Sequence, residues 1–207
     1  MDRIITIGRE FGSGGHEIGL KLAEALHVPF YDKLLVSMVA EEGEFAQEYL
    51  DEMDEKVDVH IAPFLATRSS YSVYQQPMSD RIFFRQAEII RKLADDGPCV
   101  IVGRCADYVL AERENVIRIF IYGDLEDRIA RKGKMLEMDG DALRKHVNET
   151  DKKRARYYRH YTGLKWGEKE NYDLCINTSC TGIDGAVRAI CAFIEAYPPA
   201  SESEEKK

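Results

Sequence analysis

Glycines and one serine stand together near the N-terminus, in a composition suited to binding phosphate. The segment reads Gly12, Ser13, Gly14, Gly15, His16. A β-branched run over residues 3–8 precedes it, and apolar residues at helical spacing follow it over residues 18–26. A strand, a glycine-rich turn and a helix aim backbone N–H groups at an anion beside the helix N-terminus. The pattern predicts a phosphate loop; the alternative is a tight strand-to-helix connection that holds no ligand.

The loop departs from the usual motif G-x-x-x-x-G-K-[ST] at three positions. Arg9 stands in place of the first glycine, Gly15 in place of the lysine and His16 in place of the hydroxyl. The usual lysine bridges the β- and γ-phosphates during transfer, so Arg9 is a candidate to replace it. Because Mg²⁺ prefers oxygen ligands, we expect His16 to cap the helix or to contact phosphate rather than the metal.

Three further residues could contact an anionic ligand or its metal. Arg104 follows an apolar run and a glycine, where its planar guanidinium suits a phosphate. Asp32 could bind an acceptor hydroxyl or a magnesium-bound water, or could cap the helix expected after it. Arg85 lies on a predicted helix and faces either the ligand or the surface.

A basic segment follows in a chain whose net charge is −8. Residues 128–160 hold eleven Lys or Arg against five Asp or Glu. Arg128 and Arg131 share one helix face, and Arg154 lies in a second basic helix beyond an Asp-Gly turn. Two basic helices joined by a turn predict a lid that closes over a phosphoryl group. A solvated helix face is the alternative.

The order of the elements predicts how these residues meet. Strands are expected over residues 3–8, 28–31, 99–102, 116–122 and 174–177. Helices are expected over residues 16–26, 33–41, 79–94, 104–110, 125–136, 141–161 and 184–197. Alternation of this kind predicts an α/β fold with a five-stranded parallel sheet flanked by helices. Ligands of such sheets bind at the carboxyl ends of the strands, where the loop, Asp32 and Arg104 should converge.

Composition narrows the class of protein. With 44% hydrophobic and 32% charged residues and no long apolar run, the chain is expected to be globular, with no membrane partner and no signal peptide. Five cysteines without a C-x-x-C pair indicate reduced core residues and a cytoplasmic location. The net negative charge argues against nucleic acid as a partner, leaving a nucleotide or phosphorylated metabolite. We expect one domain over residues 1–197 and a disordered tail over 198–207. Oligomeric state stays open.

Several stretches together resemble the cytidylate kinase-like family of P-loop proteins, within the nucleoside monophosphate kinase fold. They span residues 8–15, 29–33, 100–104, 151–158 and 172–178. The resemblance implies a three-layer P-loop kinase fold with a helical lid over about 128–162. It also implies an acceptor-binding insert, which we expect over about 41–80.

The resemblance also implies roles for individual residues, with ATP and Mg²⁺ as cofactors. The expected ATP-binding residues are Arg9, Gly12, Ser13, Gly14, Gly15, His16 and Arg128. The expected acceptor-binding residues are Arg85, Arg104 and Asp32. The expected catalytic residues are Arg104, Arg131, Arg154 and Asp32. No metal ligand is assigned.

Two departures from the family pattern bear on the reaction. Gly15 and Val102 stand where cytidylate kinases have the loop lysine and an acidic residue before the Gly-Arg pair. The leading hypothesis is transfer of the γ-phosphoryl of ATP to a nucleoside monophosphate such as CMP. The alternatives are a nucleotide- or phosphate-binding module with little or no catalysis, and a kinase of a non-nucleotide metabolite.

Overall fold

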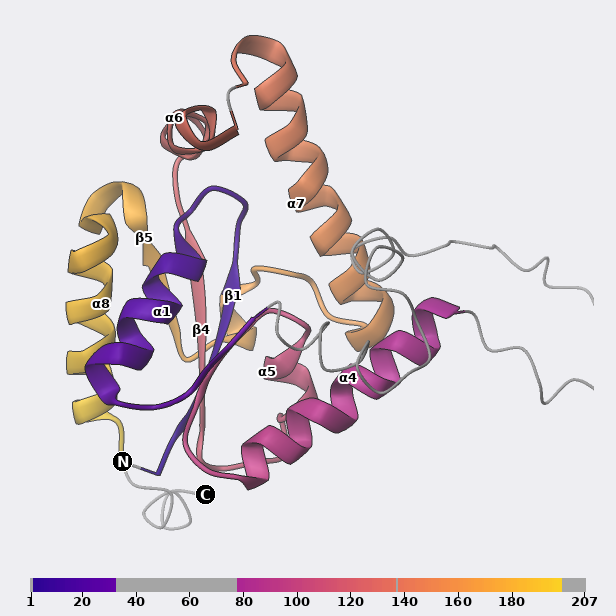
Figure 1. Ribbon diagram of the computed structural model, residues 1–207, viewed down its shortest axis with the longest axis vertical. Helices are drawn as coiled ribbons and strands as arrows, with labels where there is room; N and C mark the ends of the chain where they lie inside the picture. Colours follow the sequence, from indigo (N-terminus) through magenta and orange to yellow (C-terminus); the bar gives the residue numbers. More distant parts are fainter. Residues whose placement is uncertain (1, 33–77, 137, 199–207) are drawn as a thin grey trace, which may run out of the picture.

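A parallel five-stranded sheet forms the centre of the protein in the computed structural model (Figure 1), which describes residues 2–32, 78–136 and 138–198. The strands are β1 (Ile4–Arg9), β2 (Phe30–Tyr31), β3 (Val100–Val102), β4 (Val116–Tyr122) and β5 (Leu174–Asn177). Their order across the sheet is β2-β3-β1-β4-β5. The predicted helix over 33–41 and most of the insert lie outside the described residues, as does the tail after Pro198.

The central strands are apolar on both faces because helices cover both. In β1 and β4, Ile5 and Ile119 pack toward α1 (Gly15–Leu26) and α8 (Thr178–Ala196). Ile4 faces the other way and packs with residues of α4 (Met78–Asp95) and α5 (Ala106–Val109). Figure 1 shows α1 and α8 on one side of the sheet and α4 and α5 on the other. This three-layer arrangement confirms the predicted fold class.

Helices α6 (Leu125–Leu136) and α7 (Gly140–Thr162) form the predicted lid region. In Figure 1 they project beyond the end of the sheet, and α7 runs back toward α4. There the ring of Tyr161 stacks on Phe83 of α4, with centroids 3.9 Å apart. Burial of this aromatic pair fixes the C-terminal end of α7 against the body of the protein.

The last helix begins earlier than the sequence suggested. A first turn starts at Thr178, where the Asn177 side chain caps it by accepting from the N–H of Ser179, and the longer part after Gly182 begins about where predicted, near Asp184. Gly182 breaks the helix with φ 63°, which hid its first turn from a periodicity argument. Asp184 instead lies on the surface, where it pairs with Lys21 at 2.7 Å. The helix expected to begin at Ser79 begins one residue earlier, at Met78.

Candidate functional site

The glycine loop joins the end of β1 to the start of α1, as predicted. Gly12 and Gly14 have φ angles of 84° and 87°, which glycine adopts without strain. A Cβ on Gly12 would lie 2.7 Å from the carbonyl oxygen of Arg128, so this turn also requires a glycine for space. Because α1 begins at Gly15, the first N–H groups of the helix have no intrahelical partner and can bind an anion.

Buried hydrogen bonds fix the inner side of this loop. The Ser13 hydroxyl is fully buried and donates to the carbonyl oxygen of Glu10 at 2.9 Å. Thr178, the first residue of α8, donates to the carbonyl oxygen of Ser13 at 2.8 Å. The Ser13 side chain is therefore committed to holding the loop, and any contact of this residue with phosphate would be through its backbone.

An ionic cluster ties the loop to α6 and α7. Arg128 lies beneath the loop, with Nη1 2.5 Å from Oδ2 of Asp151 and Nε 3.2 Å from Oε2 of Glu10. Asp151 also accepts from the N–H of Phe11 at 2.7 Å. Burial raises the pKa of Glu10, although the N–H of Gly123 and the charge of Arg128 oppose this rise. The guanidinium expected to bind nucleotide is thus engaged with two carboxylates.

Asp32 lies where β2 ends and contacts two residues of the loop region. Its Oδ2 is 3.2 Å from Nε2 of His16, and its Oδ1 is 3.7 Å from Nη2 of Arg9. His16 therefore faces Asp32, and the residue that caps α1 is Gly14 rather than His16. Among the described residues, no hydrogen bond reaches the buried Oδ1 of Asp32, so this oxygen could accept from a bound ligand or water.

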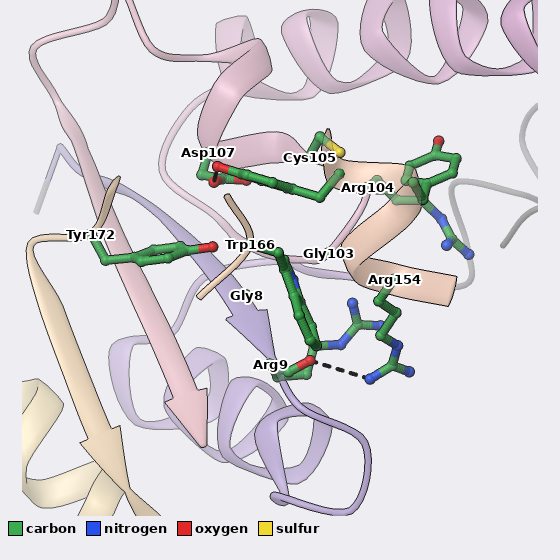
Figure 2. A pocket seen from close by; sticks show the side chains of 11 residues that line it. Gly8, Arg9, Gly103, Arg104, Cys105, Asp107, Arg154, Trp166 and Tyr172 are labelled. Carbon is green, nitrogen blue, oxygen red and sulfur yellow. Dashed lines mark hydrogen bonds between the residues drawn. The ribbon is translucent and has the colours of Figure 1, made fainter. Parts of the chain in front are cut away.

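A pocket opens between the carboxyl ends of β1 and β3 (Figure 2). Its polar lining includes Arg9, Arg104 and Arg154, and Nη1 of Arg154 donates to the carbonyl oxygen of Arg9 at 3.2 Å. Three successive residues, Gly103 to Cys105, have positive φ angles of 82°, 61° and 52°. Two of the three, Arg104 and Cys105, are not glycines, and positive φ angles in such residues are costly and cluster at functional sites. The pocket brings together two predicted catalytic arginines with the residue proposed to replace the lysine.

The far side of the same pocket holds residues that the sequence analysis did not identify. Asp107 of α5 accepts from the hydroxyl of Tyr158 at 2.7 Å, and Trp166 and Tyr172 complete the aromatic wall. Burial raises the pKa of Asp107, and its hydrogen bond from Tyr158 opposes the rise. In Figure 2, Arg9 and Arg154 lie on one side of the pocket and Asp107 on the other. The sequence signal was weak: Asp107 lies one helical turn after Gly103-Arg104.

A second, open cleft of about 540 Å³ borders the loop itself. Gly12 borders it, together with Arg131 and Lys134 of α6 and Ser179 of α8. A Cβ on Gly14 would lie 3.2 Å from Nη1 of Arg131, so this arginine reaches the loop. The volume is in the range of small-molecule sites, and a cationic wall suits a nucleotide.

Arg85 does not line either of these two pockets. It lies on α4 with its side chain 48% exposed, and it donates to Glu88 at 2.9 Å. Its predicted contact with an acceptor stays a prediction. Within residues 2–32, 78–136 and 138–198, no group of three or more His, Cys, Asp or Glu could hold a metal ion. In that same part of the chain, every helix is too short or too polar to cross a membrane.

Comparisons with known proteins agree with this geometry. A cytidylate kinase from Methanopyrus kandleri is 25% identical over an alignment of 202 residues, and the match covers 93% of each chain. An uncharacterized protein from Eubacterium ventriosum has a crystal structure that matches with a TM-score of 0.72 at 31% identity, covering 94% of this chain and 99% of that one.

More distant solved structures match in fold. The shikimate kinase from Bacteroides thetaiotaomicron gives a TM-score of 0.55 at 15% identity, over 94% of this chain and 99% of that one. A gluconokinase from Sinorhizobium meliloti gives 0.55 at 16%, over 94% and 95%. The fold is that of the P-loop kinases. The sequence model of the cytidylate kinase-like family matches residues 4–180. The chain therefore belongs to the cytidylate kinase-like family.

Proposed function

We propose that this protein transfers the γ-phosphoryl group of ATP to a nucleoside monophosphate, with CMP as the leading acceptor. One observation carries the proposal: the end of β1 borders one pocket, the glycine loop that follows it borders another, and arginines line each of them. The cleft beside Gly12, Arg131 and Lys134 suits the donor nucleotide. The pocket beside Arg104 and Arg154 suits the phosphate of the acceptor.

The described residues fit ATP and one magnesium ion. The loop supplies N–H groups at the start of α1, which is the usual cradle for the phosphates of a nucleotide. Mg²⁺ is commonly held by one or two carboxylates, waters and the substrate phosphates, and Asp32 has a buried oxygen able to accept from such a water. When bound, the metal would neutralise charge on the phosphates of the donor.

In the proposed reaction an oxygen of the acceptor phosphate forms a bond to the γ-phosphorus. The bond from that phosphorus to the β–γ bridging oxygen breaks, and ADP leaves with the electron pair. Such a transfer needs position and charge neutralisation more than covalent chemistry. Arg104 would hold the acceptor phosphate, Arg154 and Arg131 would neutralise the transferred group, and the aromatic wall of the pocket would exclude water.

Turnover with a panel of acceptors tests the proposal. Purified protein with Mg-ATP is given CMP, UMP, AMP, GMP, shikimate or gluconate, and ADP release is followed. We expect the highest kcat/KM with a pyrimidine monophosphate. A lack of turnover with every monophosphate would overturn the nucleotide kinase, and turnover with shikimate or gluconate alone would support a kinase of a non-nucleotide metabolite.

Arg104→Ala tests the assignment of the acceptor side. Loss of one well-placed cation should lower kcat/KM by about 100- to 1,000-fold, since such contacts act on the transition state. Arg91→Ala is the control, because Arg91 is exposed near the C-terminal end of α4, where the chain leads into the opposite end of β3. Equal activity of the two variants at equal melting temperature would contradict the assignment.

One set of observations favours a second candidate, a nucleotide-binding module without catalysis. Gly15 and Val102 replace the usual lysine and acid, and the N–H of Phe11 in the loop is occupied by Asp151. This candidate predicts thermal stabilisation by ATP with no ADP formed from any acceptor. The turnover panel separates it from both kinases.

A further inference from the structure

Residues 9 and 15 share a single space in this loop. A Cβ built on Gly15 would lie 2.5 Å from Cβ and 2.9 Å from Cγ of Arg9. Real Cβ atoms do not approach one another so closely, and both atoms belong to stiff parts of the chain near the backbone. Ile121 of β4 closes the same space from another side, at 3.5 Å from that Cβ position. Only one of the two positions can therefore carry a side chain.

Residues 9 and 15 are also two of the positions at which the loop departs from the usual motif. In G-x-x-x-x-G-K-[ST] the first position is glycine and the seventh is lysine. Here the first is Arg9 and the seventh is Gly15, and Gly15 is the first residue of α1. The steric conflict accounts for both departures at once: a cation that starts from residue 9 requires glycine at residue 15.

The side chain of Arg9 extends from the space beside Gly15 into the pocket between β1 and β3. A Cβ on Gly103, after β3, would lie 2.9 Å from Cζ of Arg9, so the guanidinium lies against this residue, whose φ of 82° itself favours glycine. Its Nη2 lies 3.7 Å from Asp32, after β2, and the side chain is 15% exposed. Arg9 thus starts beside the phosphate loop and ends in the pocket that holds Arg104 and Arg154. A γ-phosphoryl group passing from donor to acceptor would cross this region.

We propose that Arg9 contacts the β- and γ-phosphates of ATP in place of the missing lysine, and that Gly15 is glycine because Arg9 occupies its side-chain space. This inference rests on the proposed function for its catalytic consequence, since Arg9 would stabilise the charge that shifts to the bridging oxygen as its bond to the γ-phosphorus breaks. Arginine can serve here because its planar fork binds two phosphate oxygens at once.

A double-mutant cycle tests whether Arg9 takes the place of the loop lysine. The variants are Arg9→Gly, Gly15→Lys and Arg9→Gly with Gly15→Lys, and the readouts are Kd for ATP, Kd for adenosine and kcat. We expect Arg9→Gly to weaken ATP binding by about tenfold or more and to leave adenosine binding unchanged. The same variant should lower kcat by about 100- to 1,000-fold. Gly15→Lys alone should lower the melting temperature through the clash. The double variant should regain at least about tenfold in ATP affinity over Arg9→Gly, because it restores the usual pair.

Arg9→Gln keeps the inference testable if the glycine variants do not fold. Glutamine retains most of the stem that packs over Gly15 but carries no charge, so ATP binding should weaken while the melting temperature holds. Arg91→Gln, on exposed α4, is the matched control and should bind ATP as the wild type does. ATP binding by Arg9→Gln equal to the wild type would overturn the inference, as would an unaltered melting temperature in Gly15→Lys.

The same variants separate this inference from the proposed function. If the wild type forms no ADP with any acceptor, the kinase proposal fails. Loss of ATP affinity in Arg9→Gln and its recovery in the double variant would still support Arg9 as the phosphate contact. If the wild type turns over but Arg9→Gln retains its ATP affinity and its kcat, the kinase stands and the inference about Arg9 fails.

Discussion

Asp107 is a carboxyl group at the far side of the arginine-lined pocket, and it is almost entirely shielded from water. Its hydrogen bond from Tyr158 favours the ionised form, but burial disfavours that form more strongly and raises the pKa. A pocket with cations at one side and a buried carboxyl group at the other could bind the phosphate and a polar group of one acceptor. The two sides would then recognise different parts of that acceptor.

The raised pKa of Asp107 predicts a pH dependence of stability. The unfolded chain releases this proton near its ordinary pKa of 3.8, whereas the folded protein retains it to higher pH. The folded state therefore binds more protons in that window, and the contribution of Asp107 to the free energy of unfolding falls as pH rises through it. Asp107→Asn, which can still accept from Tyr158, should remove this part of the slope.

Urea unfolding at several pH values from 3.5 upward measures the effect. The difference in free energy of unfolding between Asp107→Asn and the wild type should shift in favour of the variant as pH increases. A difference that stays constant over the whole range would show that the two states of the chain titrate Asp107 alike.

At this scale the sequence identified residues whose type is unusual for their place. Glycines in a turn, and an arginine one residue beyond a buried strand such as Arg104, are informative without a structure. Arg128 was a different case: a basic helix face says nothing about which neighbour it meets, and here it meets Glu10 and Asp151. Asp107 and Tyr158 come from helices far apart in the chain, so only their tertiary contact marks them.

The phosphate loop and α7 are joined as elements through Asp151. This residue receives the N–H of Phe11 and the guanidinium of Arg128, both at 2.7 Å or less. Arg154, one turn later on α7, donates to the carbonyl oxygen of Arg9. The middle of α7 and Arg128 of α6 thus rest on the loop, and any closure of the proposed lid would be a movement of the outer parts of these two helices.

Asp151→Ala should destabilise the protein. It leaves a largely buried guanidinium and a backbone N–H without their shared acceptor, at a cost of roughly 2–3 kcal/mol. Denaturant unfolding measures this. Glu149→Ala on the same helix is the control, because the exposed pair of Glu149 with Lys145 at 3.8 Å should contribute less than about 0.5 kcal/mol. A loss no larger than that of the control would show that Asp151 does not hold the loop.

Element boundaries were predictable where one physical signal dominated. The strands over 116–122 and 174–177 and the helix over 125–136 have the predicted ends, because apolar runs and periodic faces mark them. The main part of α8 begins near the predicted Asp184, but the turn that precedes it from Thr178 was missed, because Gly182 interrupts the periodicity. A capping residue can be identified from sequence only where the first turn of its helix can also be recognised.

On the scale of the molecule, the parallel sheet gathers charge that the composition conceals. The chain has a net charge of −8, yet arginines from the end of β1, from the turn after β3 and from α7 meet at one edge of the sheet. That edge is where the strands β1, β3 and β2 all end, since every strand runs in the same direction. The convergence was predictable from the alternation of strands and helices, because parallel strands must end together.

ATP should stabilise the whole fold if the gathered cations bind its phosphates. At a concentration of 100 times Kd the gain is about 2.7 kcal/mol, and for a domain of this size that raises the melting temperature by roughly 5–10 °C. Thermal melts with ATP and with adenosine measure it, and adenosine should give a much smaller rise. Equal shifts in melting temperature with both ligands would show that the nucleoside, rather than the phosphates, supplies the binding energy.

The crowding between residues 9 and 15 also limits how such a loop can arise by single substitutions. A loop with arginine at 9 and lysine at 15 would put two Cβ atoms 2.5 Å apart, so that intermediate is strained. The other intermediate has glycine at both positions and carries no cation from either. Descent from the usual loop to this one would therefore pass through an ancestor whose loop held phosphate by backbone N–H groups alone.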